Sequence, residues 1–256
     1  MAAAAFRTSG MVVREDFGTI ESFEKTPTGV RMNFSNDGRR DSAEAALVVV
    51  AVGWAADTAG LNLSAAGVEL NQRKFVKVDE YLRTSTPHIF AAGDVTGRLM
   101  LVSQALPDGY VAATNAVQGP TMPVGERVSP AGSFTDPEYA QVGPTEAKAR
   151  ATHDIVAAVV NFDSTTRTVI DGRKLGFCKL IVERKTCKVL GCHVIGERAV
   201  DIAEMAAIAI AAGMRVDELA NIPLAYPTHA AVLIRAAVRA AQQLDLGVGW
   251  RAHEAA

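Results

Sequence analysis

The sequence has few cysteines, no long apolar run and almost no net charge. Three cysteines in 256 residues are an odd number, which argues against the disulfide framework of a secreted protein. No apolar run reaches the roughly 18 residues of a membrane span, and residues 1–6 are too short for a signal peptide. The net charge of −2 argues against a nucleic-acid partner, because phosphate binding needs clustered Lys and Arg. We therefore expect a cytoplasmic protein that binds neither membrane nor nucleic acid.

What is present is a globular composition, 49% hydrophobic and 21% charged, with no internal repeat. A length of 256 residues suffices for one large or two small domains. Residues 119–130 contain three prolines and two glycines, and we expect a domain boundary there.

The chain before this boundary predicts strands of a sheet that is covered on both faces. Residues 45–53 form a continuous apolar run, as in a parallel sheet. Shorter strands are expected at 75–78 and 89–94, the second ending abruptly in Gly-Asp. Asn36-Asp37-Gly38 between two short runs predicts a hairpin. A helix is expected over 101–118, and Pro107 inside it predicts a later start or a kink.

The chain after the boundary groups strands before helices, a pattern that predicts an α+β domain. Gly213 is expected to close one of the helices as a C-cap. The expected strands are 155–162, 175–183 and 187–195, and the expected helices are 145–151, 200–212 and 232–244.

The strongest functional signal is the stretch TSTPHIFAAGD at residues 84–94. A buried strand would deliver Asp94 to the carboxyl edge of a sheet, where ligands of open α/β folds bind. Gly93 would let a ligand approach the backbone, and Asp94 could accept a hydrogen bond from a sugar hydroxyl, worth roughly 1.5–3 kcal/mol. The helix that starts near Leu101 and Val102 would point its positive end at the same place, which favours an anionic ring.

These eleven residues resemble the second FAD-contacting motif of the flavoprotein disulfide reductases. That family includes dihydrolipoamide dehydrogenase, mercuric reductase, glutathione reductase and the soluble pyridine-nucleotide transhydrogenase. Residues 134–146 are similar to the opening of the family's dimerisation domain, and residues 176–180 and 189–196 are similar to its central hairpin. The match covers about residues 45–240.

The resemblance implies an α/β region followed by an α+β dimerisation domain. Residues 1–55 would be the tail of the NAD(P)-binding domain, 56–121 the returning part of the FAD-binding Rossmann-like domain, and 122–256 the dimerisation domain. It also implies FAD as cofactor, NAD(P)H as co-substrate, a small-molecule electron acceptor and a homodimer. FAD would be contacted by Gly93, Asp94, Leu101 and Val102.

Two hallmarks of the family are absent from the sequence. It contains no G-x-G-x-x-G fingerprint, and it lacks the redox-active C-x4-C pair that the family carries near its N-terminus. We therefore expect either a fragment of a longer gene product or a remnant.

Cys187 and Cys192 have C-x4-C spacing but fall in the expected dimerisation hairpin. Residues five apart in a strand point to opposite faces, so buried or half-buried thiols are expected rather than a redox disulfide. His193 is expected to be a strand residue, and no metal site is expected.

The segment Tyr226-Pro227-Thr228 departs from the family pattern. Dithiol-using members carry His-Pro-Thr followed after two residues by Glu, and Tyr226 and Ala231 stand at the His and Glu positions. A tyrosine has an ordinary pKa near 10 and is a poor base. Tyr-Pro-Thr resembles the soluble transhydrogenase, which needs no dithiol. His229 is expected at the start of the last helix without a catalytic role.

Three hypotheses about function stay open. The first is an FAD-dependent NAD(P)H oxidoreductase without dithiol chemistry, with Tyr226 at the catalytic position. The second is a dithiol reductase of the dihydrolipoamide or mercuric type. The third is a non-catalytic dimerisation fragment.

The last helix also predicts assembly. Eight of its first nine residues are apolar, so a partner subunit could cover a face that its own domain leaves open. These residues are Ala230, Ala231, Val232, Leu233, Ile234, Ala236, Ala237 and Val238.

Overall fold

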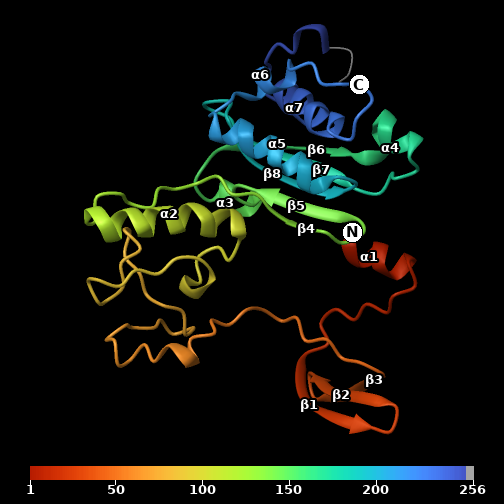
Figure 1. Ribbon diagram of the computed structural model, residues 1–256. Coiled ribbons are helices and arrows are strands. Elements are labelled where there is room, and N and C mark those ends of the chain that lie inside the picture. The colour runs from red at the N-terminus through yellow and green to blue at the C-terminus, as the bar shows by residue number, and fades with distance from the viewer. Residues whose placement is uncertain (252–256) are drawn as a thin grey trace. The chain divides into compact units, whose positions relative to one another are not determined.

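The computed structural model describes residues 1–251 and shows two compact units, residues 3–55 and the chain from residue 56 onward together with residues 1–2 (Figure 1). A short helix, α1 (Ala2–Thr8), precedes the first unit's sheet. Within the described residues, no helix is long and apolar enough to cross a membrane.

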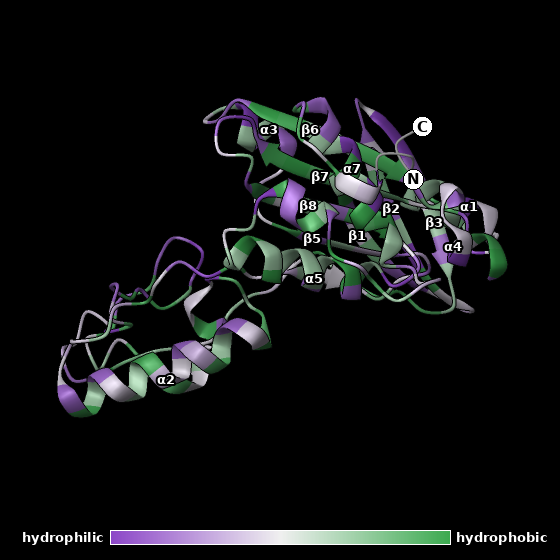
Figure 2. Ribbon diagram, turned by 90° about the horizontal axis from the view of Figure 1, so that it is seen from above, coloured by the Kyte–Doolittle hydropathy of each residue, from purple (hydrophilic) through white to green (hydrophobic). Residues whose placement is uncertain are grey.

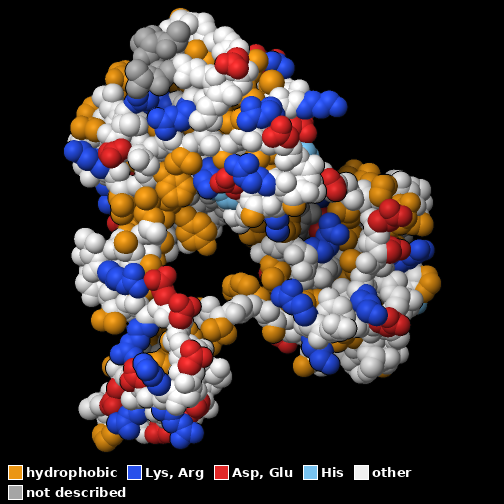
Figure 3. Space-filling view, turned by 180° about the vertical axis from the view of Figure 1, so that it is seen from behind, with side chains coloured by type: hydrophobic (Ala, Val, Ile, Leu, Met, Phe, Trp, Pro, Cys, Tyr) orange, Lys and Arg blue, Asp and Glu red, His pale blue; other side chains and the backbone are white. Residues whose placement is uncertain are grey.

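The first unit is a three-stranded antiparallel meander of β1 (Thr19–Thr26), β2 (Gly29–Asn36) and β3 (Arg39–Ala45). The predicted hairpin is confirmed. Asp37 and Gly38 link β2 to β3 with φ of 48° and 78°, the left-handed pair that a two-residue hairpin turn requires. Lys and Arg alternate with Asp and Glu over its surface (Figure 3).

The strand predicted over residues 45–53 is wrong. β3 ends at Ala45, and the apolar run that follows makes no ladder within the described chain. Leu47, Val49 and Val52 are 77%, 79% and 83% exposed. Apolar, β-branched residues form a buried strand only where neighbouring strands supply hydrogen bonds and other layers cover both faces. No described element does either here.

The strands predicted at 75–78 and 89–94 are also wrong, because no neighbouring strand in the described chain forms a ladder with them. These residues make only the isolated bridges Leu70↔Val76 and Arg83↔Phe90. The segment is instead a set of turns, including the 3-10 helices η1 (Ala59–Leu61) and η2 (Asp94–Thr96).

The helix predicted over 101–118 is confirmed as α2 (Val102–Gln118). It packs Val111 and Ala112 against Leu82 to form a small core. Pro107 lies in the second turn, so the helix does not start later to avoid it.

The rest of the chain is the predicted α+β domain, built on an antiparallel sheet of order β4-β5-β8-β7-β6. Gly213, with φ of 62°, follows the end of α5 as expected. The elements are β4 (Ala131–Ser133), β5 (Glu138–Val142), α3 (Glu146–Arg150), β6 (Ile155–Asn161), η3 (Phe162–Ser164), α4 (Thr166–Ile170), β7 (Phe177–Glu183), β8 (Val189–Gly196), α5 (Ala199–Ala211), α6 (Val216–Ala220) and α7 (Ala231–Gln243).

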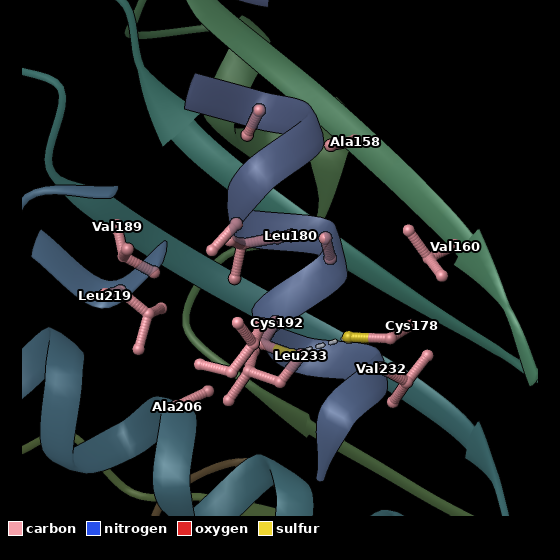
Figure 4. Packing of buried hydrophobic residues seen from close by; sticks show 14 of the residues in the cluster. Ala158, Val160, Cys178, Leu180, Val189, Cys192, Ala206, Leu219, Val232 and Leu233 are labelled. Carbon is pink, nitrogen blue, oxygen red and sulfur yellow. Dashed lines mark hydrogen bonds between the residues drawn. The ribbon is translucent and has the colours of Figure 1, made fainter. Parts of the chain in front are cut away.

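The main core lies between one face of this sheet and the helices α5, α6 and α7 (Figures 1 and 4). Cys178 and Leu180 lie two residues apart on β7, so both point to the same face of the sheet, towards Leu233 of α7. Ile181 points to the opposite face, where it joins Ile155 in a smaller cluster with α3. β6 and β7 are accordingly hydrophobic along most of their length (Figure 2).

Candidate functional site

The loop that carries Asp94 is held by its own backbone. Thr96 donates from its backbone N–H and its hydroxyl to the Gly93 carbonyl, at 3.0 and 2.8 Å. Gly97 has φ of 65° and lies on the Phe75 ring, where an added Cβ would come within 2.4 Å of a ring carbon. Only glycine fits there, so the loop is fixed against the buried Phe75.

This loop lies beside the first turns of α2. A Cβ on Gly93, which has φ of 76°, would meet the Ala105 Cβ at 3.5 Å. The Asp94 side chain is exposed and makes no hydrogen bond or ion pair within residues 1–251. The structure therefore brings the backbone of the loop that carries Asp94 beside the first turns of α2.

The N-terminus of α2 is itself uncapped. Leu101 is extended, with φ −126° and ψ 138°, and has no side chain that could cap the helix. Within the described chain, the N–H groups of Val102 and Ser103 have no acceptor. Such groups, with the helix dipole, favour an anion, and Asp94 can accept from a hydroxyl. The donor and acceptor set fits the sugar and ring of a flavin nucleotide, and the cofactor roles of Gly93, Asp94, Leu101 and Val102 stay predictions.

The first half of α2 is inverted with respect to an ordinary surface helix. Val102, Leu106 and Tyr110 are 76%, 71% and 67% exposed, although they are apolar or aromatic. Gln104 and Asp108 are buried on the opposite side. A contiguous exposed apolar stripe is typical of a binding surface.

The buried carboxylate of Asp108 is a site residue that no sequence motif had indicated. Gln104 Nε2 donates to Asp108 Oδ1 at 2.6 Å, and Arg127 Nη1 lies 3.0 Å from the same oxygen. Arg98 Nε lies 3.4 Å from Oδ2. The i, i+4 spacing of Gln104 and Asp108 on a helix was the available signal.

Tyr226 is 76% exposed and lines an open surface pocket of about 350 Å³ between α4 and α7, called here the Tyr226 cavity. Its hydroxyl is 2.6 Å from the Thr166 hydroxyl, and Ala231 and Arg235 line the same cavity. The sequence positions of the family's His and Glu are therefore neighbours in space. The described residues that line the cavity include neither an imidazole nor a carboxylate.

His229 faces a different place. Its Nε2 lies 3.0 Å from Asp171 Oδ2, and Arg167 donates to the same oxygen at 2.7 Å. The Arg167 guanidinium, more than His229, holds the pKa of Asp171 below its usual value. His229 does not line the Tyr226 cavity, in keeping with the expectation that it points elsewhere.

The expectation of free, buried or half-buried cysteines is confirmed. Cys187 lies in the turn before β8, and Cys192 faces Cys178 instead, with the two sulfurs 3.7 Å apart (Figure 4). The hydrogen bond to Cys192 and complete burial raise the pKa of the Cys178 thiol, so it is a poor nucleophile. The hairpin register brings the pair together, which spacing alone could not show.

His193 is a β8 residue, as predicted, and its Nε2 lies 3.0 Å from the Pro144 carbonyl. In the part of the chain that the structure describes, no three His, Cys, Asp or Glu side chains gather as a metal site would require.

Comparison with known proteins agrees with this architecture. Residues 4–109 match the pyridine nucleotide-disulphide oxidoreductase domain, and residues 129–237 match the dimerisation domain of the same family. The chain is 34% identical to a mercuric reductase of Bacillus cereus, over 83% of this chain and 34% of that protein. It is also 34% identical to a dihydrolipoyl dehydrogenase of Bacillus subtilis, over 84% of this chain and 46% of that protein.

Solved structures show the same relationship. LpdA from Mycobacterium tuberculosis superposes with a TM-score of 0.80 at 28% identity, covering 92% of this chain and 51% of that one. The flavoprotein disulfide reductase RclA from Escherichia coli shares the fold, with a TM-score of 0.73 at 24% identity over 83% of this chain and 48% of that one. The chain thus spans about half or less of these relatives. FAD and NAD(P)H are the cofactors of these oxidoreductases. The chain belongs to the pyridine nucleotide-disulphide oxidoreductase family.

Proposed function

We propose that this chain is the C-terminal part of an FAD-dependent NAD(P)H oxidoreductase that works without dithiol acid/base chemistry. Hydride would pass from the nicotinamide to the flavin and on to a small-molecule acceptor. The observation that carries the proposal is the Tyr226 cavity, whose described lining offers hydroxyls and guanidiniums but no imidazole or carboxylate. Dithiol chemistry needs a positioned base with a pKa near the working pH.

Bound FAD would supply the redox chemistry, and the protein would supply position and electrostatics. The Asp94 carboxylate has no partner in the described chain and is available for a sugar hydroxyl. The uncapped N–H groups of Val102 and Ser103 would favour an anionic ring. These features support cofactor-binding roles for Gly93, Asp94 and the start of α2.

Tyr226 would act on the acceptor side. Its hydroxyl shares a hydrogen bond with the Thr166 hydroxyl at the exposed mouth of the cavity, so a hydroxyl group stands ready to donate there. A donor of this kind can hydrogen-bond an acceptor molecule, but it does not replace the acid/base pair of the dithiol enzymes.

A dithiol reductase is the second candidate, because the relatives at 34% identity are mercuric reductases and a dihydrolipoyl dehydrogenase. Tyr226 and Ala231 count against it.

A non-catalytic fragment is the third candidate function. It would be favoured if a polypeptide that also supplies the N-terminal half showed no flavin absorption band after purification. For the active forms we further propose a cytoplasmic homodimer that binds neither nucleic acid nor membrane.

The decisive experiment fuses the N-terminal half of the Bacillus subtilis dihydrolipoyl dehydrogenase in front of this chain. We call this the fused enzyme. It should reduce dyes with NAD(P)H but reduce lipoamide and glutathione disulfide poorly. The double variant Tyr226→His with Ala231→Glu should raise lipoamide reduction by about 10²-fold, the lower end of what acid/base catalysis contributes. Its dye reduction should change little.

Tyr226→Phe is the matched control, because it removes only the hydroxyl. It should leave lipoamide reduction at the same low level. A fused enzyme that reduces lipoamide rapidly with Tyr226 and Ala231 in place would contradict the proposal.

A further inference from the structure

The buried face of α2 is unusually polar. Gln104, Asp108 and Asn115 are all at most 5% exposed, while Val111 and Ala112 alone supply buried apolar side chains there. A buried carboxylate is costly unless it is paired and hydrogen-bonded. Asp108, at 1% exposure, is paired with two arginines, so its place in the fold is tightly specified.

Its partners come from three separate segments. Arg98 belongs to the loop that runs from η2, with Asp94, to the start of α2. Gln104 belongs to the first turn of α2 itself. Arg127 belongs to the connection from α2 to β4, and Ser129 of the same connection approaches Gln104 at 3.4 Å. The Asp108 carboxylate therefore links three segments to one another. These are the Asp94 loop, α2, and the connection that leads from α2 to β4.

We propose that Asp108 is a positioning residue of the flavin site, which holds the Asp94 loop in register with the N-terminus of α2. This inference rests on the proposed function, since it concerns the same site. The Asp94 loop has few other anchors toward α2. Its backbone hydrogen bonds run within the loop or to Val76, and towards Ala105 even a Cβ added at Gly93 would make only an ordinary van der Waals contact, at 3.5 Å. Loss of the Arg98–Asp108 ion pair would remove the ionic link between the Asp94 loop and α2, so the loop would stay packed on Phe75 but lose its register with the helix end.

The connection has a second, independent anchor. Asn115 donates to the carbonyls of Tyr81 and Met122 and accepts from the N–H groups of Thr121 and Met122, all within 3.0 Å. Loss of Asp108 should therefore loosen the connection only beyond Met122, whereas it should loosen the whole Asp94 loop.

The first test is hydrogen exchange on the full chain. In Asp108→Asn, the amides of Thr96 and Gly97, which now bond to Gly93 and Asp94, should exchange at least tenfold faster. The amide of Leu180 in β7 should not change, because that strand belongs to a separate core. Glu126→Gln is the matched control, since it removes a carboxylate one residue from Arg127 that makes no contact in the described chain. It should change none of these rates.

Arg98→Gln keeps the inference testable if Asp108→Asn folds poorly, because Arg98 is 38% exposed. It removes only the Arg98–Asp108 ion pair, whereas Asp108→Asn also removes the pair with Arg127. It should speed exchange at Thr96 and Gly97, and the double variant should add little to Asp108→Asn, which has already lost the Arg98 pair. Unchanged exchange at Thr96 in both single variants would overturn the inference.

The second test is FAD affinity in the fused enzyme, measured by flavin fluorescence. Asp108→Asn and Arg98→Gln should each weaken FAD binding by at least tenfold, and Glu126→Gln should not. Faster exchange with unchanged FAD affinity would show a merely structural pair and overturn the positioning role. A fused enzyme that binds no FAD with Asp108 intact would instead defeat the proposed function, while the exchange result would stand by itself.

Discussion

Position along a helix separates residues that look alike in the sequence. Ile202 and Ile208 both belong to α5, yet Ile202 is 1% exposed and faces the sheet while Ile208 is 70% exposed. Ile202→Ala should destabilise the chain by about 2–5 kcal/mol, because it removes buried contacts and leaves a cavity. Ile208→Ala should stay within about 0.5 kcal/mol. Urea unfolding followed by circular dichroism measures both, and equal losses would contradict the packing of α5.

Single residues also decide which chemistry the site can perform. Tyr226 and Ala231 line the same pocket because α7 begins shortly after the Tyr226 segment, and under the proposed function this pocket lacks an acid/base pair. His229, three residues from Tyr226, is bound to Asp171 and faces another surface.

At the level of secondary-structure elements, the segment at residues 46–55 stands out because it is apolar and yet exposed to solvent. Val49 and Val52 are 79% and 83% exposed in a run with no strand partner in the described chain. Such a segment, β-branched and without charge, promotes association between chains. The double variant Val49→Lys with Val52→Lys should raise the concentration at which the chain stays monodisperse in light scattering.

The control for charge places the two lysines elsewhere. Gln72→Lys with Gln118→Lys adds the same net charge at exposed polar positions. This control pair should raise the concentration at which the chain stays monodisperse much less than the Val49 and Val52 pair does. Equal gains from both pairs would show that net charge, and not the apolar run, limits solubility.

At the scale of the whole molecule, the prediction that the last helix leaves an apolar face open is wrong. Val232, Leu233 and Ile234 of α7 are at most 2% exposed within a single chain, because the sheet on one side and α6 on the other already cover them. The helix leaves no apolar face that a partner must cover within the described residues. The homodimer stays a prediction, supported by the match of residues 129–237 to the family's dimerisation domain.

Sedimentation velocity on the full chain tests the homodimer. At tens of micromolar, the chain should sediment as a species of twice its mass of 27.0 kDa. The double variant Val49→Lys with Val52→Lys should be measured beside it, so that association through the exposed apolar run does not mimic a dimer. A species of 27.0 kDa at that concentration would contradict the prediction.

Patterns in the sequence were enough to predict the elements that depend on a few neighbouring residues. The helix α2, the hairpin at Asp37-Gly38 and the order of strands and helices in the α+β domain follow from periodicity and turn chemistry, which act over a few residues. The motif at residues 84–94 likewise pointed to the family, and the matches over residues 4–109 and 129–237 agree.

Tertiary structure alone decided what depends on partners far along the chain. The run at residues 45–53 reads as a buried strand, but a strand needs neighbours, and the described chain supplies none. The facing of Cys178 and Cys192 depends on the register of a hairpin, and the burial of Asp108 depends on Arg98 and Arg127 arriving from two other segments. Pairing between residues distant in sequence is a property of packing, which local patterns do not encode.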